Sequence, residues 1–254
     1  MSFTLQSIQR TKKISPIRML LHSPHKMGKS SFAAQIPGVI FIPTENGLDN
    51  IDTVSFPLCK TLDDFFAAIT VLLNESHNFT AVCLDTADHL EKLIFDQVCS
   101  DDPKHTKSIA DIAYGKGYKH ALGYWHKVMQ CFENLRDKRG MEYYILAHSQ
   151  IKRFNDPLAD SYDKYQIRLH DTANKHIQEI VDIIGFAQQV NTIKTEDQGF
   201  KKIRTRVETL DIRKIFLHRT AAYDAGCRIH GMPTEVNLDY QSFRAALDAA
   251  RDQA

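Results

Sequence analysis

The sequence lacks any apolar run long enough to cross a membrane. No segment of the 254 residues approaches the roughly 18 consecutive apolar residues of a membrane-spanning helix, and residues 1–15 contain no apolar run of signal-peptide length. The chain has no large excess of either charge: it contains 32 basic and 31 acidic residues, which gives a formal net charge of +1. We therefore expect a soluble cytoplasmic protein without a membrane partner, in which any contact with a polyanion depends on a local patch.

Disulfide and metal-binding motifs are also missing. The five cysteines are odd in number and form no CxxC pair, which favours free thiols in a reducing compartment over a disulfide framework. Twelve histidines are present, but no HExxH motif and no Cys/His ligand spacing occurs. The sequence therefore predicts no zinc site.

The chain is organised around residues 17–36, which read IRMLLHSPHKMGKSSFAAQI. An apolar run breaks at Ser23, and a polar loop then leads into apolar residues at helical spacing, which predicts a strand, a loop and a helix. A phosphate loop of the pattern GxxxxGK[ST] needs this context, because backbone N–H groups at the helix start must curl around an anion. The residues that we expect to bind the phosphates are Ser23, Pro24, His25, Lys26, Met27, Gly28, Lys29, Ser30 and Ser31.

Two residues of this loop have specific predicted roles, and one departs from the pattern. We expect Lys29 to reach the β- and γ-phosphates of ATP and the Ser30 hydroxyl to ligate Mg²⁺. Ser23 stands where the pattern has its first glycine, and serine has less access to positive φ than glycine, so the turn must be tighter or differently wound. The alternative is a strand-to-helix turn that contains Gly-Lys-Ser by chance. ATP and Mg²⁺ are thus the predicted cofactors, and the efficiency of hydrolysis stays open.

Two carboxylates follow predicted buried strands. Glu45 comes shortly after an apolar strand over 39–43, and Asp85 ends a strand over 80–85. The carboxyl ends of parallel strands form the ligand-binding edge of such a sheet. We expect Glu45 to position or deprotonate the attacking water, with a turn carboxylate as the alternative, and we expect Asp85 to hold the Mg²⁺ shell.

A third predicted strand, over 141–147, ends just before His148, Ser149 and Gln150. A polar side chain at this edge is placed to sense the γ-phosphate and to relay its loss to the loop beyond. His148 and Gln150 therefore join Lys29 and Glu45 as candidate catalytic residues. A hydrogen-bonded strand end is the alternative interpretation.

The segments between these strands show helical periodicity. A helix over 61–73 opens with a capping signature, Asp88 is expected to cap a helix over 89–98 rather than to take part in catalysis, and a long helix ending at Lys138 places Trp125 in the core. This alternation of strands and helices predicts an α/β fold with a mostly parallel sheet flanked by helices.

Clustered positive charge occurs late in the chain. Residues 191–219 alternate as a β-hairpin does and carry the basic residues Lys201, Lys202, Arg204 and Arg206, which could follow the phosphate backbone of DNA. A solvated hairpin face is the alternative. A second candidate is the loop expected over 152–170, where Lys152 and Arg153 mix with aromatic residues in a way that suits single-stranded nucleic acid.

Five segments carry a resemblance to a known family: HSPHKMGKSSFAAQIPGVIFIPTENGLDNI, AVCLDTADHLE, YGKGY, ILAHSQ and AGCRIHGMP. Over residues 17–245 the chain resembles the phage-encoded RecA-like ATP-binding proteins, the group that contains the Sak-type single-strand annealing recombinases. The resemblance implies a RecA-like core that binds ATP and Mg²⁺, and it gives Glu45 the place of the catalytic carboxylate, Asp85 the Mg²⁺ place and residues 148–150 the sensor place.

The same resemblance implies partners and a biological setting. Such proteins assemble on single-stranded DNA, promote annealing or strand pairing and often work beside a single-strand DNA-binding protein, which implies a homo-oligomer, a filament or a ring, in the cytoplasm of an infected or lysogenic bacterium. We expect one domain in three parts: a polar lead-in (1–15), a RecA-like nucleotide-binding core (16–190), and a basic hairpin with a closing helix (191–254). The alternatives are a phosphate-loop kinase of small molecules and a nucleotide-binding scaffold that does not hydrolyse ATP.

Overall fold

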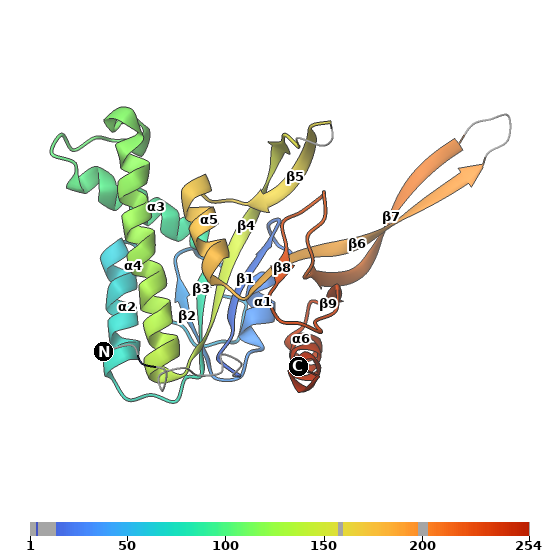
Figure 1. Cartoon of the computed structure of the whole chain (residues 1–254), viewed down its shortest axis with the longest axis horizontal. Helices are drawn as coiled ribbons and strands as arrows, with labels where there is room; N and C mark the ends of the chain where they lie inside the picture. Colours follow the sequence, from blue (N-terminus) through green and yellow to red (C-terminus); the bar gives the residue numbers. More distant parts are fainter. Residues whose placement is uncertain (1–3, 5–13, 157–159, 198–202, 254) are drawn as a thin grey trace.

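The computed structural model describes residue 4 and residues 14–156, 160–197 and 203–253, and within 191–197 and 203–211 it describes the backbone alone. Five parallel strands form the centre of one sheet (Figure 1). Their order is β2, β3, β4, β1, β6, so that β4 separates β1 from β3. Their bounds are β1 Arg18–Ser23, β2 Val39–Pro43, β3 Ala81–Asp85, β4 Glu142–Phe154 and β6 Ile183–Asp197.

Helices cover both faces of this sheet (Figure 1). Alternate residues of each strand point to opposite faces, so Leu20 packs in the core under four helices: α2 (Leu62–Asn74), α3 (Ala87–Asp101), α4 (Lys116–Arg139) and α5 (Asp171–Ile180). Leu21 packs on the other face under α1 (Lys29–Ala34) and α6 (Tyr240–Asp252). Two short 3-10 segments, Ile109–Asp111 and Ala113–Gly115, precede α4. Trp125 is fully buried, as predicted.

The prediction of a loop over 152–170 is wrong, because residues 152–154 and 162–167 form β-strands. Strand β4 continues past the parallel sheet to Phe154 and pairs in antiparallel register with β5 (Tyr162–Ile167). The prediction failed because the mostly polar residues of this hairpin lack the apolar alternation by which a half-buried strand is recognised. His148 consequently lies inside β4, at the point where its pairing changes from β1 to β5.

The predicted late β-hairpin is confirmed. Strand β6 pairs in antiparallel register with β7 (Ile203–Phe216), and the two extend away from the body of the molecule (Figure 1). Two short strands, β8 (Gly226–Cys227) and β9 (Glu235–Asn237), pair with β6 and β7. Lys201 and Lys202 lie outside the described residues, and for Arg204 and Arg206 only the place on β7 is given. The domain boundary after residue 190 stays a prediction, and β6 crosses it.

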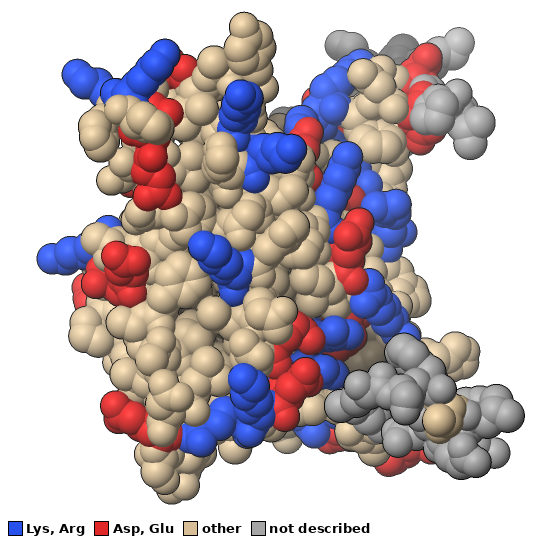
Figure 2. All heavy atoms as spheres, turned by 60° about the vertical axis from the view of Figure 1, so that its left-hand side comes forward, with Lys and Arg blue, Asp and Glu red and all other residues tan. Residues whose placement is uncertain are grey.

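Charge is distributed evenly over the helical face of the molecule. Figure 2 shows Lys and Arg interspersed there with Asp and Glu, in keeping with the net charge of +1. None of the helices that the structure describes has the length and apolar character needed to cross a bilayer. The five cysteines are free thiols.

Candidate nucleotide-binding site

The loop between β1 and α1 has the curled backbone that a phosphate loop needs. Lys26 and Gly28 both adopt the left-handed conformation, with φ of 61° and 100°. Only glycine takes such a φ without strain, which explains Gly28. Arg213 of β7 donates a hydrogen bond to the Met27 carbonyl at 3.3 Å. Ser31 is exposed at the start of α1.

Ser23, which replaces the first glycine of the pattern, has a definite partner. Its hydroxyl donates to the Pro24 carbonyl at 2.8 Å and accepts from Lys29 Nζ at 3.1 Å. The Lys29 side chain is buried, and burial lowers its pKa, although the nearby carboxylates of Asp85, Asp88 and Glu45 oppose that shift. Lys29 therefore lies inside the loop, held by Ser23.

Ser30 and Asp85 form the pair that a Mg²⁺ ion would require. The Ser30 hydroxyl donates to Asp85 Oδ2 at 2.6 Å, across the gap between α1 and β3. The other oxygen, Oδ1, is buried and has no hydrogen-bond partner among the residues that the structure describes. Burial also raises the pKa of Asp85. A hard divalent cation prefers oxygen ligands, so this hydroxyl and the unpartnered carboxylate oxygen fit Mg²⁺.

Glu45 lies at the same edge of the sheet. Its Oε2 is 2.9 Å from His89 Nδ1, and its Oε1 is 3.9 Å from His148 Nε2. Burial raises the pKa of this carboxyl group, while the nearby His148 opposes the shift. A raised pKa makes a carboxylate a stronger general base.

Asp88 does not cap the helix, and that prediction is wrong. Thr86 holds the N-cap position of α3, and Asp88 lies in the first turn with its carboxylate turned inward. It accepts hydrogen bonds from the backbone N–H and Nδ1 of His148, at 3.0 and 3.1 Å, and from Arg168. Burial alone would raise its pKa, but the hydrogen bonds from His148 and Arg168 outweigh burial and hold the pKa well below its ordinary value.

His25 joins the loop to this group. Its ring stacks on the His148 ring with centroids 3.9 Å apart, and its Nε2 lies 3.2 Å from Arg168 Nη1. Burial and the nearby cationic groups lower the pKa of His25. The structure thus brings together a lysine, two serine hydroxyl groups, three carboxylates, three histidines and two arginines around the phosphate loop.

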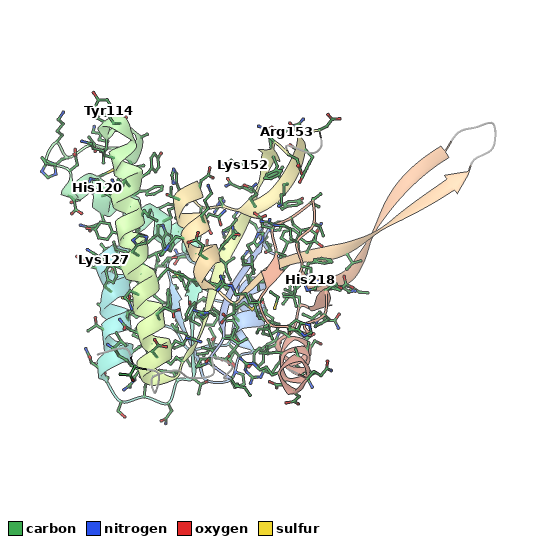
Figure 3. All side chains as sticks on the ribbon, in the orientation of Figure 1. Tyr114, His120, Lys127, Lys152, Arg153 and His218 are labelled. Atoms are coloured by element: carbon green, nitrogen blue, oxygen red, sulfur yellow. The ribbon has the colours of Figure 1, made fainter. Side chains whose placement is uncertain are left out.

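Other candidates lie away from this cluster. The Gln150 amide donates to the Ile167 carbonyl at 3.4 Å, within the β4–β5 hairpin. Lys152 pairs with Asp171 at 2.7 Å, and Arg153 approaches Asp163 at 3.8 Å. Figure 3 shows Lys152 and Arg153 on the β4–β5 hairpin.

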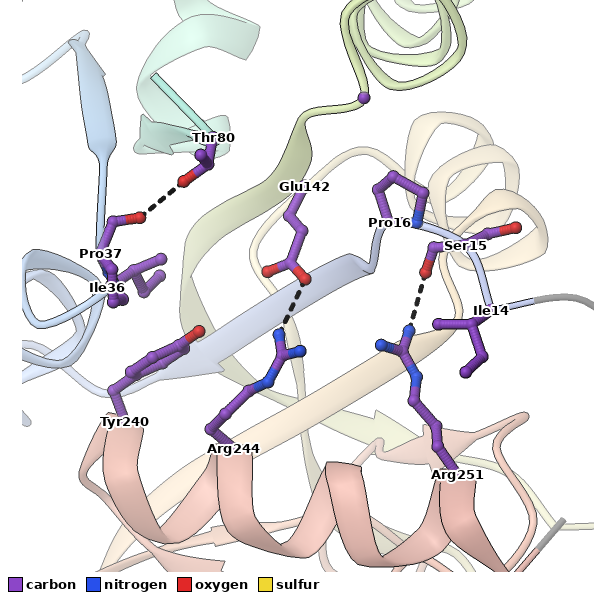
Figure 4. A pocket seen from close by; sticks show the side chains of 11 residues that line it. Ile14, Ser15, Pro16, Ile36, Pro37, Thr80, Glu142, Tyr240, Arg244 and Arg251 are labelled. Carbon is purple, nitrogen blue, oxygen red and sulfur yellow. Dashed lines mark hydrogen bonds and ion pairs between the residues drawn. The ribbon is translucent and has the colours of Figure 1, made fainter. Parts of the chain in front are cut away.

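A pocket of about 420 Å³ is unrelated to the phosphate loop (Figure 4). Its lining includes Thr80 and Glu142, which stand at the amino ends of β3 and β4. The phosphate loop follows the carboxyl end of β1, and β1 is parallel to β4. The pocket therefore lies at the opposite end of the sheet from the candidate site.

Four residues of the site were not predicted as site residues from the sequence: Asp88, His89, Arg168 and Arg213. The first two follow Asp85 within one helical turn, and that spacing was the available signal. Arg168 and Arg213 are far from the loop in sequence, so only the fold brings them to it.

Comparison with known proteins gives two positive findings. A search of curated proteins finds no match. Among solved structures, the chain is similar to the crystal structure of the RadB recombinase, with 12% identity over 88% of this chain and 87% of that chain and a TM-score of 0.46. Residues 15–220 match the family model described as an AAA domain.

The matched residues contain the phosphate loop, Glu45 and Asp85, and the strands and helices around them. The predicted α/β fold, a mostly parallel sheet flanked by helices with an antiparallel extension towards the end of the chain, is confirmed. Since the match covers most of its length, the chain belongs to the AAA domain family.

Proposed function

We propose that this protein is an ATP- and Mg²⁺-dependent protein that binds single-stranded DNA and promotes strand annealing or pairing in recombination, as do the phage-encoded Sak-type recombinases that its sequence resembles. A homo-oligomer, as a filament or ring, and cooperation with a single-strand DNA-binding protein are parts of this proposal. One observation carries its nucleotide-binding half: Ser30, the unpartnered Asp85 oxygen and Lys29 converge beneath a curled loop.

The residues of the site have distinct roles in this proposal. Lys29 leaves Ser23 to contact the β- and γ-phosphates, and Ser30 and Asp85 hold Mg²⁺, which supplies positive charge against the phosphate oxygens. Glu45 positions the attacking water and accepts its proton. His148, fixed by Asp88, and His25 lie beside Glu45 and the loop, where they can contact the γ-phosphate.

The geometry of the β4–β5 hairpin supports the DNA-binding half. A groove of about 360 Å³ runs between this hairpin, α5 and the segment near residue 220, and its lining includes Lys152, Arg153, Lys175, Arg219 and Phe154. Lys152 and Arg153 make exposed ion pairs with Asp171 and Asp163, and exposed pairs exchange readily because they contribute little free energy. Basic and aromatic side chains in one groove suit a single strand.

The two alternatives make different demands on the chain. A small-molecule kinase needs an arginine-rich lid over a second substrate, whereas the basic residues that we assign to ligand binding here lie on the two hairpins. A scaffold that binds ATP without turnover is favoured by the contact of Lys29 with Ser23 and by the ion pair of Glu45 with His89. The rate of hydrolysis separates the proposal from the scaffold.

The test of the whole proposal is ATP hydrolysis measured with and without single-stranded DNA. Stimulation by DNA supports a recombination ATPase, ATP binding without turnover supports the scaffold, and turnover that DNA does not change contradicts the proposal. The measurement uses poly-dT, because phosphate contacts do not depend on base sequence.

The test of the groove is the salt dependence of DNA affinity, measured by fluorescence anisotropy. Each phosphate neutralised on a single strand contributes about 0.7 to the slope of log affinity against log salt, so alanine at both Lys152 and Arg153 is expected to flatten the slope by about one unit. Alanine at both Lys116 and Lys119, exposed residues of α4, is the matched control and leaves the slope unchanged. If alanine at Lys152 and Arg153 also leaves the slope unchanged, alanine at both Lys202 and Arg204 is tested next.

A further inference from the structure

Three side chains that can ligate a metal ion converge beside the phosphate loop. Glu45 follows β2, His89 lies in the first turn of α3 and His148 lies on β4; one ligand atom from each lies within 4.8 Å of the others. The two oxygens of Glu45 each approach one histidine: Oε2 lies 2.9 Å from His89 Nδ1, and Oε1 lies 3.9 Å from His148 Nε2. Ligand atoms around a tetrahedral zinc ion stand about 3.3 Å apart, a value between these two.

The second nitrogen of His148 is held in the way that metal-binding histidines require. Both oxygens of Asp88 lie 3.1 Å from His148 Nδ1. A carboxylate can only accept, so the hydrogen stays on Nδ1 and Nε2 is the nitrogen that faces Glu45. A carboxylate behind the imidazole orients the ring and raises the basicity of the ligating nitrogen. Arg168 in turn fixes this carboxylate.

The cluster is partly exposed to solvent. The side chains of Glu45 and His89 are 24% and 26% exposed, and that of His148 is 6% exposed. An ion can therefore reach the ligands from solvent. His89 Nδ1 also lies 3.0 Å from Thr86 Oγ1.

We propose that Glu45, His89 and His148 form a binding site for a divalent transition metal ion, zinc above all, separate from the site that Ser30 and Asp85 offer to Mg²⁺. Imidazole nitrogen selects zinc over magnesium, and two histidines with one glutamate leave a fourth position open. An ion held there occupies the Glu45 carboxylate, so it inhibits any hydrolysis that depends on Glu45 as a base. No sequence motif marks this site, because its ligands come from three separate elements of the fold.

Binding of Zn²⁺ to the full chain, freed of metal and without nucleotide, tests the proposal. A chromophoric chelator that competes for the ion gives the affinity, and Co²⁺ as a substitute gives a visible absorption band. We expect one equivalent to bind with micromolar or tighter affinity, and His89→Gln to weaken binding by at least about tenfold, because loss of an outer-shell partner alone costs that much.

The matched control is His126→Gln. The His126 ring lies 4.2 Å from that of His176, so this variant disturbs another histidine pair, and it is expected to leave Zn²⁺ affinity unchanged. The proposal is overturned if His89→Gln binds Zn²⁺ as tightly as the wild-type protein, or if the wild-type protein binds Zn²⁺ only with a dissociation constant above about 100 µM. If His89→Gln does not fold by circular dichroism, Glu45→Gln decides by the same criterion.

The outcome is independent of the proposed function. Lys29→Ala keeps all three ligands and is expected to bind Zn²⁺ as tightly as the wild-type protein. Loss of ATP binding in that variant with zinc binding retained shows two separate sites. Failure of the ATP assignment therefore does not affect the metal test.

Discussion

Replacement of Asp88 by asparagine tests the interaction that joins three elements at the site. The Asp88 carboxylate accepts from His148 on β4 and from Arg168 after β5, and it is 3% exposed. Asparagine keeps the size but loses the charge, and its amide group faces donors that it cannot accept from. Breaking a buried ion pair by removing one partner costs about 3–5 kcal/mol. Because the Arg168 side chain is 35% exposed, we expect a loss of stability at the lower end of this range.

A loss of about 3 kcal/mol corresponds to a fall in melting temperature of roughly 6–12 °C for a chain of this size. The effect has a defined pH dependence. The folded pKa of Asp88 lies well below the unfolded value of 3.8, so its contribution is fully present above that value and is lost as the pH falls below it. The difference between the wild-type protein and Asp88→Asn is therefore constant from pH 8 to about pH 5 and narrows only below about pH 4.

The assay is thermal unfolding followed by circular dichroism at pH 7 and pH 5. Asp171→Asn is the matched control, because the Asp171 carboxylate pairs with Lys152 but is 62% exposed, and an exposed pair contributes at most about 1 kcal/mol. A melting temperature of Asp88→Asn within about 2 °C of the wild-type value, less than 1 kcal/mol, refutes the view that this carboxylate holds the site together.

Three further predictions concern the nucleotide. Lys29→Ala is expected to weaken ATP binding about 10- to 150-fold, the equivalent of one charged hydrogen bond, and equal affinity by calorimetry contradicts the phosphate-loop assignment. Glu45→Gln should retain ATP binding and lose at least about 100-fold in turnover, and undiminished turnover would show that Glu45 is only a turn carboxylate. Asp85→Asn should lower turnover and also weaken its dependence on Mg²⁺. Ser23→Gly should bind ATP equally or more tightly, because Lys29 loses a competing acceptor, and a clear loss of affinity would show that the hydroxyl group is needed.

The centre of the fold was predictable because short-range patterns determine it. The strand over 39–43 is continuous and apolar and was found with its bounds intact, and the capping box of α2 between Thr61 and Asp64 was readable from two residue types. The approach of Ser30 to Asp85 followed from a rule of topology, because the carboxyl ends of parallel strands meet at one edge. Each of these inferences needs only local sequence or the order of elements.

The rest of the candidate site depends on side-chain direction and on long-range pairing. Asp88 was expected at a helix start because it lies near one, but α3 begins two residues earlier than predicted and turns Asp88 inward. His89 looked like an ordinary helix residue, and its contact with Glu45 depends on how α3 meets the end of β2. The β4–β5 hairpin was missed because a solvated hairpin has little apolar pattern.

The two basic hairpins are attached to the phosphate loop by one arginine each. Arg168, directly after β5, lies beside His25 and binds Asp88, and Arg213 of β7 binds the Met27 carbonyl. A phosphate bound in the loop would lie near both of these contacts. DNA bound to a hairpin would contact the same segment of chain that carries the arginine. If both ligands bind, linkage requires that the factor by which ATP changes DNA affinity equals the factor by which DNA changes ATP affinity. Loss of that coupling in Arg168→Ala, with binding of each ligand alone retained, would assign it to the β4–β5 hairpin, and loss in Arg213→Ala would assign it to the β6–β7 hairpin.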